Sequence, residues 1–178
     1  MASAFAHLAI PALLYVVSQK RPLGLRLFMV ASFASILPDA DVIAFMFGVA
    51  YESAWGHRGF THSLMFAFIV AVVLTRFQDT LQAGRSTIFW VSFISCISHA
   101  LLDALTNGGL GVALLWPFSQ ERFFFPFRPI EVSPIGISNF FTERGVQVIV
   151  SELKWVFMPA SILGAASFAI RFRLRKRS

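Results

Sequence analysis

Six ionisable side chains lie inside apolar segments of the sequence, and a seventh lies directly before one. A charged group at the centre of a membrane helix costs about 2.5–3.5 kcal/mol on insertion scales, so such residues are functional candidates by default. All four histidines of the chain belong to this set. The seven are His7, Asp39, Asp41, His57, His62, His99 and Asp103. Because imidazole and carboxylate groups bind metals, a metal site is the first hypothesis.

The spacing within this set brings ligands together in pairs. His99 and Asp103 are four positions apart, which places both side chains on one face of a helix and within reach of one cation. His57 and His62 lie on either side of a predicted turn that opens a helix. For each pair alone, a satisfied structural role explains the pattern as well. Four histidines and three aspartates, all in apolar or boundary sequence, favour a metal site.

The segment Leu37–Asp41 is an irregular, acidic place in apolar sequence. Pro38 removes a backbone hydrogen bond of the helix, and Asp39 and Asp41 follow it. Within a membrane, freed backbone groups are tolerated only where they face protein or a water-filled cavity. A helix cap would explain the two carboxylates structurally, but their position inside an apolar stretch favours a place in the metal site.

The composition identifies the chain as a membrane protein. Hydrophobic residues make up 57% of its 178 residues and charged residues 13%, and 21 residues are phenylalanine. A soluble domain has about 45–50% and about 25% respectively. The composition also excludes disorder. The single cysteine, Cys96, excludes an intrachain disulfide and a zinc site built from cysteines.

Five apolar stretches predict an all-α bundle of about five transmembrane or membrane-embedded helices with the metal site at one end. They cover about residues 3–18, 25–49, 62–76, 86–106 and 155–172. A crossing helix needs about 20 apolar residues, so the second and fourth stretches qualify and the others are short. We expect one membrane-embedded domain over residues 1–172 and a basic tail over 173–178. Because His7 interrupts the first stretch and no basic residues precede it, we expect no cleaved signal peptide.

Basic residues predict which end of the bundle is cytoplasmic. The net charge is +6, and basic residues gather in two connections and after the fifth stretch. They are Lys20, Arg21, Arg26, Arg76, Arg85, Arg171, Arg173, Arg175, Lys176 and Arg177. The positive-inside rule then places the N-terminus and the metal site outside and the C-terminus in the cytoplasm. We interpret the tail as an anchor to anionic headgroups, not as a nucleic-acid surface, although simple solvation explains its last residues equally well.

The connection over about residues 107–154 is long and rich in aromatic residues and proline. Its Leu115–Phe118 and Phe123–Phe127 segments predict a loop in the membrane interface, where aromatic rings settle. An ordinary packed cap over the helices is an equal alternative. Four basic residues in this loop weaken the charge asymmetry, although they are widely spread. We expect the part after Trp116 to cover the site and to admit an acyl chain.

The expected ligand set contains nitrogen and oxygen and no thiolate. It suits zinc best, with manganese or iron as alternatives, and does not suit copper(I) or an iron–sulfur cluster. Seven candidates exceed the three protein ligands of a mononuclear catalytic zinc, so we expect one or two ions, with an aspartate bridging if there are two. Two metals about 3.5–4 Å apart are common in phosphoester hydrolysis because they hold the attacking and leaving oxygens.

These residues, in order, resemble the YdjM-like family of inner-membrane metal-dependent hydrolases. The resemblance covers about residues 5–130 and rests on His7, Leu37–Asp41, His57–Ser63, His99–Asp103, Thr106–Gly109 and Leu115–Phe118. The His-Arg-Gly-x-Thr-His-Ser run at residues 57–63 is its most specific part. It implies a multi-pass hydrolase of a bacterial inner membrane. The His-x-x-x-Asp motif is also similar to that of zinc-dependent phospholipase C, which points to a phosphoester in a lipid.

We therefore expect a membrane-bound hydrolase in which a metal-activated water cleaves a phosphoester of a lipid or lipid-like substrate. Asp41 is expected to be a general base or a bridging ligand. Arg58 is expected to clamp a phosphate oxygen, although an arginine that snorkels to the interface explains it nearly as well. The expected metal ligands are His7, Asp39, His57, His62, His99 and Asp103, and the side chains expected to orient them are Thr61, Ser63, Thr106 and Asn107. The expected partners are membrane lipids, not nucleic acid.

Two other classes of protein share some of these features. A transporter also has intramembrane histidines and aspartates, but it spreads them through the membrane and usually has repeated halves. In this sequence they gather at one level and no repeat is visible. A membrane protein with a purely structural metal has a closed site of four ligands with no surplus acid. Seven candidates beside an arginine argue weakly against that class.

Overall fold

The secondary structure of the described residues is helical, with a long connection after α6. The computed structural model describes residues 1–18, 23–135 and 137–175. Within these residues two isolated bridges form, Thr106 with Ile130 and Val112 with Phe123, and there is no strand. The elements are α1 (Ala4–His7), α2 (Ala9–Val17), α3 (Leu25–Ile36), η1 (Leu37–Phe47), η2 (Phe60–His62), α4 (Leu64–Leu74), η3 (Thr75–Phe77), α5 (Gln78–Leu81), α6 (Arg85–Ala104), α7 (Ile137–Phe140), α8 (Glu143–Glu152), the π-helical η4 (Leu153–Phe157) and α9 (Met158–Arg175).

Four helical segments are long and apolar enough to cross a membrane, and a fifth is shorter. The four are Leu25–Phe47, Leu64–Leu81, Arg85–Ala104 and Glu143–Leu174, and the shorter one is Ala4–Val17. Each of them overlaps one of the five apolar stretches, which confirms the predicted bundle. Large apolar side chains such as Phe33, Phe68 and Ile162 are exposed on these helices, as expected of helices whose surroundings are lipid.

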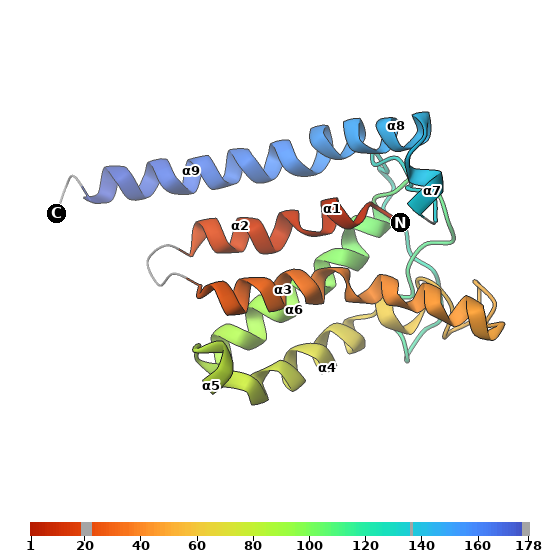
Figure 1. Ribbon diagram of the computed structural model, residues 1–178, viewed down its shortest axis with the longest axis horizontal. Helices are drawn as coiled ribbons and strands as arrows, with labels where there is room; N and C mark the ends of the chain where they lie inside the picture. Colours follow the sequence, from red (N-terminus) through yellow and green to blue (C-terminus); the bar gives the residue numbers. More distant parts are fainter. Residues whose placement is uncertain (19–22, 136, 176–178) are drawn as a thin grey trace.

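α6 forms the centre of the bundle and packs against α3 and α4. Ala34 of α3, Ala67 of α4 and Ala100 of α6 meet in one buried cluster. Small residues let membrane helices approach closely, so these alanines explain why the three helices pack so tightly. On the other side of α3, Figure 1 shows α2 lying between α3 and α9.

The two ends of the bundle differ in chemistry. In Figure 1 the N-terminus and η1 (orange) lie towards one end, while the C-terminus and α5 lie at the other. The basic connections belong to the α5 end: Arg76 and Arg85 flank α5, and Arg26 donates a hydrogen bond to the Thr80 carbonyl at 2.9 Å. Lys20, Arg21, Lys176 and Arg177 lie outside the described residues. The predicted separation of charge from candidate ligands is therefore found, and which end faces the cytoplasm stays a prediction.

The last membrane helix begins earlier than its apolar stretch predicts. The stretch was expected over about 155–172, whereas the helix begins at Glu143 and continues through η4 into α9. α8 is amphipathic, with Glu143 and Arg144 in its first turn and Val148 buried. A search for uninterrupted apolar residues misses such a helix because half of its surface is polar. The long connection is correspondingly shorter than predicted.

The connection after α6 packs over the end of the bundle where the N-terminus lies. Ala113 N–H donates to the Arg58 carbonyl at 2.9 Å, and the ring of Trp116 lies 4.7 Å from that of Phe60. At its rim, Phe118 is 88% exposed. This loop is therefore a packed cap that also presents aromatic side chains outward, and its place in the membrane interface stays a prediction.

Candidate metal centre

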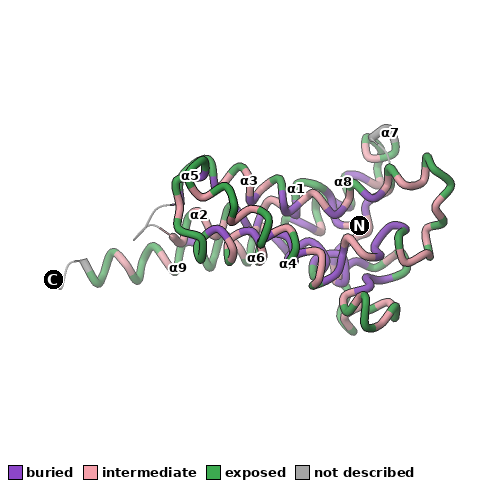
Figure 2. The backbone as a smooth tube through the Cα atoms, turned by 90° about the horizontal axis from the view of Figure 1, so that it is seen from below, coloured by how far each residue is buried: buried purple, intermediate pink, exposed green. Residues whose placement is uncertain are grey.

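Four segments that are far apart in the sequence meet at this end of the bundle. α1 contributes its last residue, η1 contributes its first turns, the turn before α4 contributes two histidines, and α6 contributes its last turns. In Figure 2 buried backbone (purple) runs along α6 and gathers around the N-terminus. The residues brought together are His7, Asp39, Asp41, His57, His62, His99 and Asp103. The six expected metal ligands and Asp41 therefore lie in one cluster.

Local sequence explains how each segment presents its ligands. Pro38 lies directly after α3, in the first turn of η1, and without an N–H it cannot continue the hydrogen-bond ladder of α3. In the turn over residues 56–62, a Cβ on Gly56 or Gly59 would collide with backbone oxygens, and Arg58 has a left-handed φ of 63°. These glycines let the chain fold tightly enough to bring His57 and His62 to the same place.

The tightest group is a quartet formed by Asp39, His62, His99 and Asp103, hereafter the His/Asp quartet. Each residue offers one ligand atom, and these atoms all lie within 4.8 Å of one another. The His62 and His99 Nε2 atoms are 3.0 Å apart, and His99 Nε2 lies 3.2 Å from Asp39 Oδ1. His62 Nε2 lies 3.5 Å from Asp103 Oδ2. Two nitrogens and two carboxylate oxygens thus converge on one point.

The second nitrogen of each quartet histidine is already held by an acceptor. His99 Nδ1 lies 2.8 Å from the Ser35 carbonyl, which can only accept, so this nitrogen carries the hydrogen. His62 Nδ1 lies 3.0 Å from the Thr61 hydroxyl, which itself donates to Asp41 Oδ2 at 2.6 Å. Both rings therefore direct their Nε2 atoms inward, as metal-bound histidines do when a second partner fixes the ring.

The carboxylates of the quartet favour a positive charge between them. Burial lowers the pKa of His62, but the neighbouring carboxylates of Asp103, Asp39 and Asp41 raise it to about 10. In the absence of a metal, a proton on His62 therefore fills the space between the two Nε2 atoms. Asp39 Oδ1 and Asp103 Oδ2 are buried and have no partner in hydrogen-bond geometry among the described residues. The donor set fits a divalent cation that takes nitrogen and oxygen ligands, such as zinc.

Asp41 lies beside the quartet and fixes its surroundings. One of its oxygens lies 2.7 Å from His57 Nδ1, and the other accepts hydrogen bonds from Arg58 N at 3.2 Å and from the Thr61 hydroxyl at 2.6 Å. Asp41, His57 and His62 also form a second group that could hold a metal ion. The contacts themselves show Asp41 orienting both histidines, whereas its roles as general base or bridging ligand stay predictions.

His57 and His7 lie next to the quartet without belonging to it. His57 Nε2 is buried and has no hydrogen-bond partner among the described residues, and the same holds for both ring nitrogens of His7. The His7 ring stacks on that of His99 with centroids 3.6 Å apart, and its Nε2 lies 3.8 Å from Asp103 Oδ1. Both histidines could supply a further ligand after a small side-chain movement.

Arg58 is fully buried and its guanidinium contacts protein on three sides. Its Nε lies 2.9 Å from Asp103 Oδ2, Nη1 donates to the Gly108 carbonyl at 2.9 Å, and Nη2 donates to the Thr106 hydroxyl at 3.0 Å. This placement excludes the alternative of a snorkelling arginine, whose head would lie in water. In this conformation Arg58 holds Asp103 and the cap together, and its role as a phosphate clamp stays a prediction.

Two of the four expected orienting residues reach the site, and two serve nearby elements. Thr61 contacts Asp41 and His62 directly, and Thr106 accepts from Arg58. Ser63 instead caps the N-terminus of α4 by accepting from Phe66 N–H at 3.1 Å. Asn107 accepts from Val132 N–H at 2.9 Å and so orders the returning chain.

Sequence reasoning missed the contribution of Glu152. This carboxylate is buried at the end of α8 and accepts hydrogen bonds from Ser3 N–H and the Ser3 hydroxyl. Ser3 is the N-cap of α1, and the preceding N–H in the chain, that of Ala2, donates to Asp103 Oδ1 at 2.6 Å. Glu152 therefore fixes the short helix that carries His7. A lone carboxylate before a long apolar run was the available signal, but its partner is 149 residues away.

Fold and site together define a multi-pass helical membrane protein with a buried His/Asp centre at one end of its bundle. Comparison with known proteins gives the family. The sequence matches the family described as YdjM inner membrane protein over residues 1–177, so the chain belongs to that family. It is also 42% identical over 164 residues to "Inner membrane protein YbcI" of Escherichia coli (strain K12), a match that covers 92% of this chain and 95% of the relative. No solved structure matches the chain.

These comparisons confirm the resemblance inferred from the motifs and the multi-pass inner-membrane location. Neither name states a reaction, a substrate or a metal.

Proposed function

We propose that this protein is a membrane-bound, metal-dependent hydrolase that cleaves a phosphoester in a lipid or lipid-like substrate. The observation that carries the proposal is the convergence of His62 Nε2 and His99 Nε2, 3.0 Å apart, with the other nitrogen of each ring held by an acceptor. Such a pair is prepared to bind a cation. Asp39 and Asp103 complete a set of two nitrogen and two oxygen ligands.

A divalent cation at the quartet would polarise a phosphoryl oxygen and lower the pKa of a bound water towards neutrality. The chain's own residues prepare the place for that chemistry. Thr61 and Asp41 fix the ring of His62, and the Ser35 carbonyl fixes that of His99. Arg58 holds Asp103 from the side of the cap.

Access to the quartet supports a catalytic role. Three of its members are fully buried, but the side chain of Asp39 is 13% exposed. Asp39 is therefore the ligand at which a substrate can approach or exchange with water. The histidines His7 and His57 add ring nitrogens without hydrogen-bond partners among the described residues, a surplus that a closed structural site does not need.

One observation favours a second candidate, a purely structural metal. The quartet itself supplies four protein ligands, the number that closes a structural zinc site. In that case the metal would stabilise the junction of α6, η1 and the turn before α4, and no substrate would be hydrolysed. The two functions differ in whether activity accompanies the metal.

The test is a hydrolysis screen with purified protein in mild detergent. Lipid phosphates and phosphodiesters are supplied with zinc, manganese or iron, and phosphate or headgroup release is measured for wild type, Asp39→Asn and Asp79→Asn. Asp79 is an exposed carboxylate on α5 at the other end of the bundle and serves as the matched control. We expect release by wild type and Asp79→Asn and loss of about two orders of magnitude or more in Asp39→Asn, since removing one transition-state-stabilising contact costs about 10²–10³. If the protein binds metal but releases no phosphate or headgroup, the metal has a structural role and the hydrolase proposal is wrong.

A further inference from the structure

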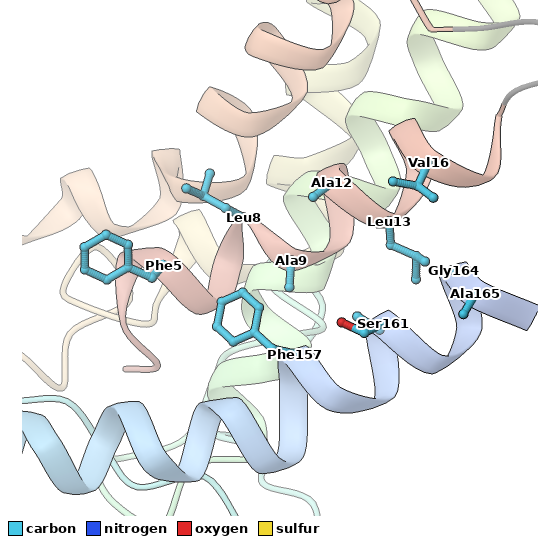
Figure 3. Close-up of a pocket in the computed structure, with 11 residues that line it drawn as sticks. Phe5, Leu8, Ala9, Ala12, Leu13, Val16, Phe157, Ser161, Gly164 and Ala165 are labelled. Carbon is cyan, nitrogen blue, oxygen red and sulfur yellow. The ribbon is translucent and has the colours of Figure 1, made fainter. Parts of the chain in front are cut away.

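An apolar groove runs along the outside of the bundle between α2 and α9. Its volume is about 520 Å³, within the range of about 300–1,000 Å³ that is usual for small-molecule sites. Figure 3 shows side chains from both helices directed into it. They are mostly apolar and many are small, as with Phe5, Ala9, Ala12, Phe157, Gly164 and Ala165. The lining includes no ionisable side chain.

The end of the groove far from the metal centre is closed by close helix packing and by a basic side chain. At Gly164 the two helices come so near that a Cβ would lie 3.6 Å from Val16 and 3.8 Å from Leu13. About two turns further, Arg171 donates to the carbonyls of Val17 and Val16 at 2.6 and 3.2 Å. These contacts mark the end of the groove far from the metal centre.

The other end of the groove lies beside the metal centre. Phe5 and Leu8, which line the groove, are close neighbours of His7 in the chain. His7 turns inward and stacks on His99, whereas Phe5 is exposed on the outside. One short stretch of chain thus presents one face to the His/Asp quartet and the other to the groove.

The length of the groove corresponds to one leaflet of a membrane. Phe5 and Val16 mark its two ends along the chain. At a rise of about 1.5 Å per residue, these eleven steps span about 16 Å. The hydrocarbon core of a bilayer is about 30 Å thick, so the groove covers roughly half of it. An acyl chain from the leaflet whose headgroups lie at the site end has this extent.

We infer that the groove holds one acyl chain of a glycerophospholipid whose phosphate-bearing headgroup lies at the site end. This inference rests on the proposed function and names its substrate class. The groove is formed by segments apolar enough to lie in a membrane, where hydrocarbon chains are what surrounds the protein. A chain that moves from the bilayer into the groove gains packing, not burial from water, so shape decides binding. The acyl chain then lies between α2 and α9 and not under the loop after Trp116.

A larger side chain at the closed end of the groove should shorten the acyl chain that fits. Ala165 lines the groove at that end, and its neighbour Ala166 is exposed on the same helix but does not line it. Purified wild type, Ala165→Phe and the matched control Ala166→Phe are loaded with phosphatidylglycerol carrying octanoyl or palmitoyl chains. The amount of lipid retained per protein molecule is measured by native mass spectrometry. We expect the palmitoyl-to-octanoyl ratio to fall about tenfold in Ala165→Phe alone, as overpacking disfavours an ill-fitting occupant.

A second variant guards against a folding defect. Ala12→Phe fills the groove from the facing helix and should lower retention of both lipids, while circular dichroism confirms unchanged helicity. Equal palmitoyl retention in wild type and Ala165→Phe would overturn the inference. A wild-type dimer that the Ala165→Phe substitution dissociates would also overturn it, because a second copy of the protein would then occupy the groove. If Ala165→Phe selectively loses palmitoyl retention but the wild type hydrolyses no substrate, the groove binds an acyl chain and the proposed hydrolase function is wrong. If all variants hydrolyse lipids with the same dependence on acyl-chain length, the protein is a hydrolase and the groove does not hold the acyl chain.

Discussion

The Nε2 atoms of His62 and His99 face each other at 3.0 Å, although the two residues are 37 positions apart. Each ring is fixed from behind, by Thr61 for His62 and by the Ser35 carbonyl for His99. Two acceptor nitrogens cannot remain at this distance unless a proton or a cation lies between them. This relationship is the basis on which the site is interpreted as a metal centre.

Removing Arg58 should destabilise the protein strongly. Its guanidinium lies 2.9 Å from Asp103 and bridges the Thr106 hydroxyl and the Gly108 carbonyl, all in buried surroundings. Arg58→Ala leaves a buried carboxylate without its partner, which typically costs about 3–5 kcal/mol. Thermal unfolding in detergent measures the change. Arg58→Lys keeps the charge but not the planar fork, so it should recover only part of the loss. Wild-type stability of Arg58→Ala would show that the cap is held by other contacts.

The hydroxyl of Thr61 should contribute more to metal affinity than its methyl group does. It links Asp41 to His62 Nδ1 at 2.6 and 3.0 Å. Thr61→Val keeps the shape and removes the link, and loss of such outer contacts typically lowers metal affinity about 10–100-fold. Thr61→Ser retains the hydroxyl and serves as the control. Zinc titration with a competing chelator distinguishes the two variants, and equal affinities would remove Thr61 from its orienting role.

Glu152 should stabilise the protein through Ser3. Glu152→Ala leaves the Ser3 N–H and hydroxyl without their acceptor, and an unsatisfied buried group costs about 1–3 kcal/mol. Because α1 also carries His7, we expect the ring stacking of His7 on His99 to loosen as well. Glu143→Ala, an exposed acid of the same helix, is the matched control and should leave the melting temperature near that of wild type. A similar melting temperature for both variants would contradict this account.

The charge asymmetry predicts a definite orientation in the membrane. Thr80→Cys places a thiol in α5 at the basic end, and Gln120→Cys places one in the exposed part of the cap. The native Cys96 is buried and gives a low background. With intact cells or spheroplasts and a membrane-impermeant maleimide, we expect Gln120→Cys to react and Thr80→Cys to react only after lysis. The reverse pattern would invert the topology.

The sequence was sufficient for the parts of the site that depend on residue type and local spacing. The i, i+4 relation of His99 and Asp103 survives because α6 is a regular helix there. Composition and apolar length gave the bundle, because in a membrane these two properties largely decide which segments are helical. The family resemblance drawn from His57–Ser63 and its companion motifs is confirmed over nearly the whole chain.

What the sequence could not give were roles set by long-range contacts. The contacts of Arg58 with the Thr106 hydroxyl and the Gly108 carbonyl join parts of the chain about fifty residues apart, and its place between two histidines does not reveal them. Ser63 and Asn107 lie beside ligands in the chain and yet bond to other elements. Likewise, nothing local to α8 reveals that it begins the last membrane helix, because its apolar face is discontinuous in sequence.

The metal centre is tested most directly by zinc X-ray absorption spectroscopy, together with metal analysis, on protein purified without chelators. We expect about one or two metal ions per protein molecule and a first shell of nitrogen and oxygen at about 2.0–2.2 Å, with no sulfur. His99→Ala should lose the metal, whereas Asp79→Asn should keep it. Wild-type protein without bound metal under conditions that preserve its fold, or a metal retained in full by His99→Ala, would contradict the claim.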